Sequence, residues 1–116
     1  MALDPKRTVA ELKELRALTG DENGAQRVAW TETWEQACGW LRDLVAETGA
    51  NESIDAAGNQ WFTLRGESER AVLIGGHLDS VPNGGWLDGS LNVVCAGEGL
   101  RGSQQCNHAG QVRRAE

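Results

Sequence analysis

The first predicted helix follows from the spacing of aliphatic residues near the start of the chain. These residues recur at steps of three: Val9, Leu12, Leu15 and Leu18. Such spacing is typical of an amphipathic helix. Thr8 and Glu11 have the separation of a capping box, in which each side chain accepts a hydrogen bond from the other residue's amide, so we expect Thr8 to cap this helix. Gly20 lies where a helix often ends in a left-handed residue.

A second helix is predicted between Thr31 and Gly49. Its apolar residues fall three or four positions apart and form one face: Trp34, Ala37, Cys38, Leu41, Leu44 and Val45. Thr31 is the expected N-cap, since its hydroxyl can accept a hydrogen bond from a free amide of the first turn. Glu32 and Glu35 then lie near the positive end of the helix dipole.

The pattern becomes that of strands after Gly49. Residues 52–55 and 60–65 are expected to pair as a hairpin around a turn at 56–59. The apolar run Ala71–Ile74 is followed by two glycines and predicts a buried strand. Two helices, a hairpin and a buried strand are the opening of an α/β domain, in which sites form at the carboxyl ends of strands.

The pattern weakens near residue 94. Ser90 is a suitable cap for a further helix, but Gly97, Gly99 and Gly102 follow closely. Each glycine inside a helix costs about 0.8–1 kcal/mol relative to alanine. We therefore expect residues 95–116 to be a divergent, weakly ordered tail. Our hypothesis for this change of pattern is a shifted reading frame or a premature stop.

Charge and composition exclude several classes of function. The net charge is −6, and no basic stripe is present to neutralise phosphates, so a nucleic-acid partner is not expected. The chain has no apolar run long enough to cross a membrane and no apolar leader near its start. Its three cysteines are widely spaced and do not suggest a disulfide framework. These features predict a cytoplasmic protein with free thiols.

The loop at residues 75–89 carries the candidate chemistry. His77 offers an imidazole nitrogen and Asp88 offers carboxylate oxygens, which are ligand types that zinc accepts. Asp79 could accept a hydrogen bond from the other ring nitrogen of His77 and so orient the ring. A polar loop that binds no metal can hold the same three residues, so their spacing alone does not decide between the two interpretations.

The same loop, GGHLDSVPNGGWLDG, resembles the first metal-ligand segment of the M20 dinuclear metallohydrolases. The likeness is greatest to the branch of N-carbamoyl-L-amino-acid hydrolases, allantoate amidohydrolases and β-ureidopropionases. Two earlier segments, at 26–31 and 55–59, resemble that branch in the expected order. The resemblance implies that residues 1–94 are the N-terminal part of a zinc-hydrolase catalytic domain, truncated after the metal loop.

The resemblance also implies roles for the three polar residues of the loop. His77 would ligate one metal, Asp88 would bridge two divalent metals, and Asp79 would orient His77. Zinc, manganese, cobalt and nickel all accept such ligands. The substrate would be a small N-carbamoyl amino acid or ureido compound, and the family's homodimer would form through a domain that this chain lacks.

Part of the family's machinery has no match in this sequence. The family uses a Glu-Glu pair, as base and ligand, and further histidines, whereas this chain has no Glu-Glu dipeptide and only His108 besides His77. Glu98, flanked by glycines, is not expected to replace the base. We therefore expect an amidohydrolase fragment that is inactive as this short chain. The alternatives are a non-catalytic interaction module derived from the same fold and a peptidase-type member of the family.

Overall fold

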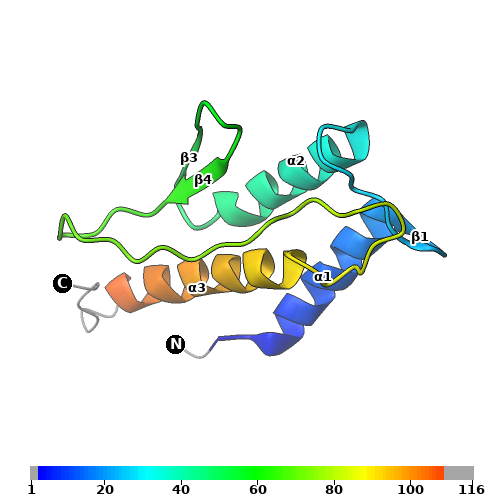
Figure 1. The fold of residues 1–116 in the computed structure, drawn as a ribbon. Helices are drawn as coiled ribbons and strands as arrows, with labels where there is room; N and C mark the ends of the chain where they lie inside the picture. Colours follow the sequence, from blue (N-terminus) through cyan, green and yellow to red (C-terminus); the bar gives the residue numbers. More distant parts are fainter. Residues whose placement is uncertain (1–2, 109–116) are drawn as a thin grey trace.

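Three helices and two small antiparallel sheets make up the computed structural model, which describes residues 3–108 (Figure 1). The helices are α1 (Pro5–Thr19), α2 (Glu32–Ala46) and α3 (Ser90–His108). One sheet pairs β1 (Gly20–Asp21) with β2 (Gly24–Ala25), and the other pairs β3 (Asn51–Ile54) with β4 (Gln60–Thr63). The α/β class, the two early helices and the hairpin are therefore confirmed.

The start of α1 differs from the prediction. The Asp4 carboxylate caps this helix by accepting hydrogen bonds from the amides of Lys6 and Arg7, at 3.0 and 3.1 Å. Pro5 occupies the first turn, where its fixed φ suits a helix and its missing N–H is not needed. Thr8 instead donates its hydroxyl hydrogen to the Asp4 carbonyl at 3.3 Å, so the predicted capping box is wrong.

The other helix ends match the prediction only in part. The Thr31 hydroxyl accepts the Trp34 amide at 3.3 Å, which confirms Thr31 as the N-cap of α2. Gly20 ends α1 with φ −129°, which is extended and not left-handed. The reason is that Gly20 is already the first residue of β1.

The hydrophobic core forms where the helices meet. Its buried members come mainly from α1 and α2: Leu15, Ala37, Leu41, Val45 and Leu78. The predicted apolar face of α2 is therefore confirmed. On α1, Val9 and Leu18 are 48% and 46% exposed. Steps of three drift around a helix of 3.6 residues per turn, so these two residues lie on opposite sides of α1.

Residues 71–74 do not form the predicted buried strand. Val72, Leu73 and Ile74 are exposed by 69%, 76% and 63%, and the segment has no regular secondary structure. A strand requires a neighbour that accepts and donates its backbone hydrogen bonds. Within residues 3–108 the strands pair only as β1–β2 and β3–β4, so this segment has no such neighbour.

Helix α3 also departs from expectation, because it continues through the glycines to His108. Two of these glycines are buried at close contacts between elements. A side chain at Gly97 would lie 3.2 Å from Leu44, and one at Gly102 would lie 3.1 Å from Leu3. Close packing at Gly97 and Gly102 thus offsets the low helix propensity of glycine. The weak order expected for the tail stays a prediction. Residues 109–116 lie outside the described residues, and the boundary at residue 94 remains a prediction.

A network of ion pairs joins the three helices at Arg101. This buried guanidinium contacts the carboxylates of Glu11 on α1, Glu47 next to α2 and Glu98 on α3, at 2.7, 2.8 and 3.4 Å. Burial lowers the pKa of Arg101, but its pairs with Glu11 and Glu47 outweigh that effect and raise it. Burial raises the pKa of Glu11 despite its contact with Arg101.

Glu98 links α3 to the start of α1. Its carboxylate accepts two hydrogen bonds from Arg7, at 2.9 and 2.8 Å, and one from the Asp4 amide at 2.7 Å. Because of the bonds from Arg7, and against the effect of burial, the pKa of Glu98 falls to about 2. A carboxylate held in this way is a poor proton acceptor, so its geometry agrees with the expectation that Glu98 is no catalytic base.

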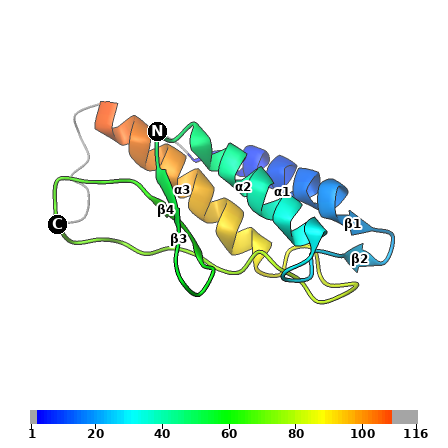
Figure 2. The same cartoon turned by 90° about the horizontal axis from the view of Figure 1, so that it is seen from above.

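The molecule is thin in one direction, with extents of 46 × 35 × 18 Å. Seen from above, the three helices lie side by side (Figure 2). The radius of gyration, 14.9 Å, exceeds the value of about 13.4 Å expected for a compact domain of this length. The core is consequently a single layer between the helices. In the described part of the chain, no helix combines the length and apolar character needed to cross a bilayer.

Replacing Asp4 by alanine tests the cap of α1. Loss of the capping carboxylate leaves the Lys6 and Arg7 amides without their acceptor, and we expect the free energy of unfolding to fall by about 0.5–2 kcal/mol. Urea denaturation followed by circular dichroism measures this change. Asp4→Asn, which keeps an acceptor oxygen, should cost less. Equal losses for the two variants would contradict the assignment of Asp4 as the cap.

The low pKa of Glu98 predicts a pH-dependent contribution to stability. Since the folded-state pKa is about 2 and the ordinary value is 4.5, the contribution is complete above pH 4.5 and is lost as the pH falls toward 2. Glu98→Gln should lower Tm at pH 7 by at least about 4 °C, the shift produced by about 1 kcal/mol in a domain of this size. The difference from the parent protein should shrink at pH 3. Exposed Glu22→Gln is the control, and a difference that is the same at both pH values would refute the assignment.

Candidate metal centre

Buried Arg27 holds the two ends of the candidate loop together. Its side chain is fully buried, with Nε donating to the Leu78 carbonyl at 2.6 Å and Nη2 donating to the Trp86 carbonyl at 3.2 Å. Burial lowers the pKa of Arg27, while the negative charges of Asp79 and Asp88 oppose that shift. Sequence reasoning missed this role, because the chain pattern alone does not show that an arginine lies beneath a loop.

The end of β2 and the residue after it form a second attachment for the loop. Ala25 and Gly84 exchange backbone hydrogen bonds of 2.8 and 3.0 Å. The Gln26 side chain donates to the Asn83 Oδ1 atom at 2.7 Å and accepts the Asn83 amide at 3.1 Å. Asn83 has a positive φ of 54°, which asparagine adopts more readily than most residues. Residues 25–27 thus fix the loop from beneath and from one side.

The three predicted site residues lie together. The Nδ1 atom of His77 is 3.3 Å from Asp79 Oδ1 and 3.1 Å from the Asp79 carbonyl oxygen. The other ring nitrogen, Nε2, is 3.7 Å from Asp88 Oδ2. The histidine ring therefore has one carboxylate at each nitrogen. All three side chains are open to solvent, with exposures of 53%, 42% and 80% for His77, Asp79 and Asp88.

Gly89 allows the start of α3 to approach His77. Its φ is +69°, and a side chain at this position would collide with the His77 carbonyl oxygen and lie 2.6 Å from the imidazole ring. The next residue, buried Ser90, donates its hydroxyl hydrogen to the Trp86 carbonyl at 2.7 Å. Asp88 therefore has its position beside the ring because the two residues after it pack closely against the loop.

The pair His77 and Asp88 can form part of a metal site. The 3.7 Å separation is too long for a hydrogen bond. Donor atoms that share one zinc ion lie roughly 3.4 Å apart, given bond lengths of about 2.0–2.2 Å and tetrahedral angles. The donor types and their spacing thus fit a divalent cation. Within the described residues, however, no group of three or more His, Cys, Asp or Glu side chains could hold a metal ion.

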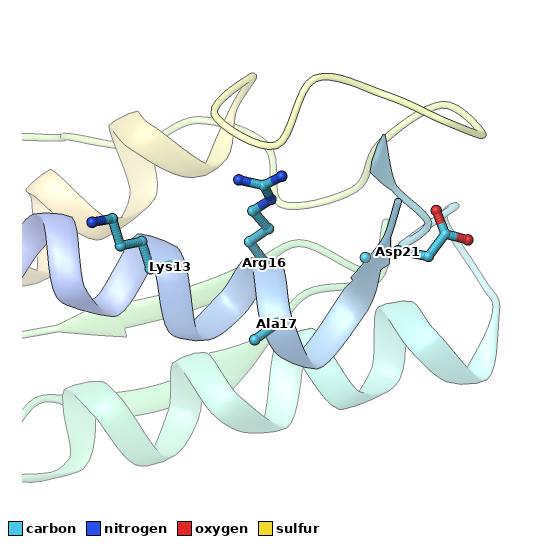
Figure 3. A pocket seen from close by; sticks show the side chains of 5 residues that line it. Lys13, Arg16, Ala17 and Asp21 are labelled. Carbon is cyan, nitrogen blue, oxygen red and sulfur yellow. The ribbon is translucent and has the colours of Figure 1, made fainter. Parts of the chain in front are cut away.

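A shallow pocket on α1 lies next to the loop (Figure 3). It is lined by Lys13, Arg16, Ala17, Gly20 and Asp21. The Arg16 guanidinium points toward the loop and lies 5.1 Å from the centre of the Trp86 ring, a cation–π contact. Trp86 itself is half-buried and packs on α1, two residues before Asp88.

The chain resembles known enzymes in sequence. No protein-family model matches it. It is 32% identical over 98 residues to an N-carbamoyl-L-amino-acid amidohydrolase of Paenarthrobacter aurescens, covering 83% of this chain and 24% of that protein. It is 31% identical over 90 residues to allantoate deiminase 1 of Glycine max, covering 76% of this chain and 19% of the relative.

A solved structure shares its fold. A hydantoinase/carbamoylase family amidase from Burkholderia phymatum superposes with a TM-score of 0.82 at 31% identity, covering 95% of this chain and 27% of the enzyme. The predicted resemblance to the carbamoylase and allantoate amidohydrolase branch is therefore confirmed. The chain spans about a quarter of the length of the relatives it matches. By sequence and by fold, it is a relative of the hydantoinase/carbamoylase amidases that corresponds to part of one such protein.

Proposed function

We propose that this chain is the metal-loop portion of an amidohydrolase that acts on linear C–N bonds of N-carbamoyl-L-amino acids or allantoate. The observation that carries the proposal is the placement of Asp79 and Asp88 at the two ring nitrogens of His77. The names of the matched relatives support this substrate class over the peptidase-type alternative.

Each residue of the loop has a separate role in this proposal. His77 would ligate one ion through Nε2, and Asp88 would use its carboxylate to bridge that ion and a second one. Asp79 would accept the Nδ1 hydrogen of His77, which selects the tautomer with a free Nε2 lone pair. Arg27 would contribute indirectly. Its hydrogen bonds to the Leu78 and Trp86 carbonyls hold the two sides of the loop and so set the distance between His77 and Asp88.

A divalent cation at such a site supplies Lewis acidity, which ionises a water molecule near neutral pH and polarises a carbonyl group. The residues of this chain contribute the positions of two ligands and the orientation of the imidazole. The loop offers no base, and Glu98, which lies on α3, is held by Arg7. The chain alone is therefore proposed to bind a metal weakly and not to turn over substrate, since catalytic groups act as a unit.

Zinc titration followed by calorimetry tests the metal role. We expect the heat of binding to disappear in His77→Ala and Asp88→Asn, because each variant removes one of the two ligands. Asp79→Asn should weaken binding by about tenfold, the usual effect of losing an orienting partner. His108→Ala is the matched control, as His108 is the other histidine of the chain. If that control lost binding while His77→Ala retained it, the site would be misassigned.

The absence of turnover is a separate expectation. Purified protein loaded with zinc, manganese or cobalt should release no ammonia from N-carbamoyl-L-alanine or from allantoate above the rate of a metal-only blank. The physical reason is the lack of a positioned base and of further ligands among the described residues. Ammonia release that depends on both metal and His77 would contradict this part of the proposal and leave the metal role intact.

A further inference from the structure

Arg27 is a buried cation that touches no carboxylate. Its side chain is 0% exposed, and among residues 3–108 it forms no ion pair and its Nη1 atom has no hydrogen-bond acceptor. Arg101, which is also buried, contacts three carboxylates instead. Buried charges are normally paired, because removing a charge from water is costly. Arg27 therefore requires opposing charge from groups that it does not touch.

A longer chain could not bring that opposing charge into contact with Arg27. The residue has no exposed surface, so a further segment could reach the guanidinium only by displacing residues that already pack around it. The lack of an ion pair consequently follows from the residues that enclose Arg27. It does not follow from the chain spanning about a quarter of the length of its relatives.

The two carboxylates of the loop lie on either side of the points that Arg27 holds. Its Nε atom bonds to the carbonyl of the residue before Asp79, and its own carbonyl accepts the amide of the residue after Asp79, at 2.6 and 3.0 Å. Its Nη2 atom bonds to a carbonyl two residues before Asp88. The negative charges that oppose the lowering of the Arg27 pKa by burial are those of Asp79 and Asp88. These two side chains are thus the source of the opposing charge.

We propose that Arg27 is the counter-ion of Asp79 and Asp88 in the metal-free loop. The two carboxylates lie at opposite nitrogens of the His77 ring, where their like charges repel each other. A buried positive charge beneath them offsets that repulsion, and the carboxylates in turn offset the cost of burying the guanidinium. The loop can therefore keep its shape before any metal binds.

A divalent cation at the loop would have to compete with this internal charge. Asp88 attracts both cations, while the positive charges of Arg27 and of the metal oppose each other. The charge of Arg27 thus lowers the affinity of the loop for a metal, although its hydrogen bonds position the ligands. This consequence rests on the proposed metal role, whereas the counter-ion role of Arg27 does not.

A double-mutant cycle in EDTA at low ionic strength tests the counter-ion role. Replacing Asp79 and Asp88 together by Asn should lower Tm by at least about 4 °C, because the buried cation is left unopposed. In Arg27→Gln the same pair of substitutions should have little effect, since the cation is gone. Arg27→Lys loses the forked hydrogen bonds as well but keeps the charge, so most of the loss should return. The difference between the Lys and Gln backgrounds isolates the charge.

A matched control separates this coupling from a general effect of charge. Glu22→Gln combined with Glu69→Gln removes two exposed carboxylates elsewhere and should change Tm by the same amount in all three backgrounds. No loss of Tm in the parent chain, or equal losses in Arg27→Lys and Arg27→Gln, would overturn the proposal. Should neither Arg27 variant fold, Asp79→Glu with Asp88→Glu in the parent chain still decides. This pair keeps both charges and should retain a higher Tm than the Asn pair, and an equal or lower Tm would overturn the proposal.

Zinc calorimetry of the two Arg27 variants tests the competition with a metal. Both lack the forked hydrogen bonds and only Arg27→Lys is charged, so Arg27→Gln should bind zinc about threefold or more tightly than Arg27→Lys. Equal or tighter binding by Arg27→Lys would contradict the competition. If the parent chain and both variants bind no zinc, the proposed metal role fails and the competition fails with it. The cycle in EDTA would then still decide whether Arg27 is the counter-ion.

Discussion

The ion-pair network around Arg101 is the constraint on which the arrangement of the three helices depends. The carboxylates that it gathers come from α1, from the end of α2 and from α3, while the apolar core beside it is only one layer thick. Breaking a buried pair by removing one partner costs about 3–5 kcal/mol, because the remaining charge has no compensation. In a thin molecule that cost is a large part of the total stability. The network therefore determines which helix faces meet as much as the aliphatic residues do.

The loop at residues 75–89 is also held by a buried arginine, in this case through hydrogen bonds to backbone carbonyls. Arg27 lies beneath the loop and bonds to two of its carbonyl oxygens, so a buried cation again supplies order that apolar contacts do not. The exposed groups of the loop, His77 and Asp88, can then remain open to solvent and still keep a defined separation. Arg27 thus positions the loop from beneath, while His77 and Asp88 present their polar groups at the surface.

Sequence reasoning predicted what depends on local pattern and missed what depends on distant partners. The apolar face of α2, its Thr31 cap and the hairpin follow from residues close in sequence, and the structure contains all of them. The grouping of His77, Asp79 and Asp88 also follows from a short loop. The buried strand at 71–74 depended on neighbouring strands, and α3 depended on the packing of its glycines against Leu44 and Leu3. The pattern within one segment shows neither whether a strand has neighbours nor what the glycines of a helix pack against.

Helix α3 links the two charged centres of the molecule mechanically. Gly89, just before the helix, packs against His77, and Ser90, its first residue, bonds to the Trp86 carbonyl; Arg101 lies eleven residues further along the same helix. At 1.5 Å per residue, the two points are about 17 Å apart on one stiff rod. A shift of the helix at the Arg101 end would consequently change how Gly89, next to Asp88, packs against His77. The geometry of the loop is therefore coupled, over that distance, to the ion pairs of Arg101 that join the helices.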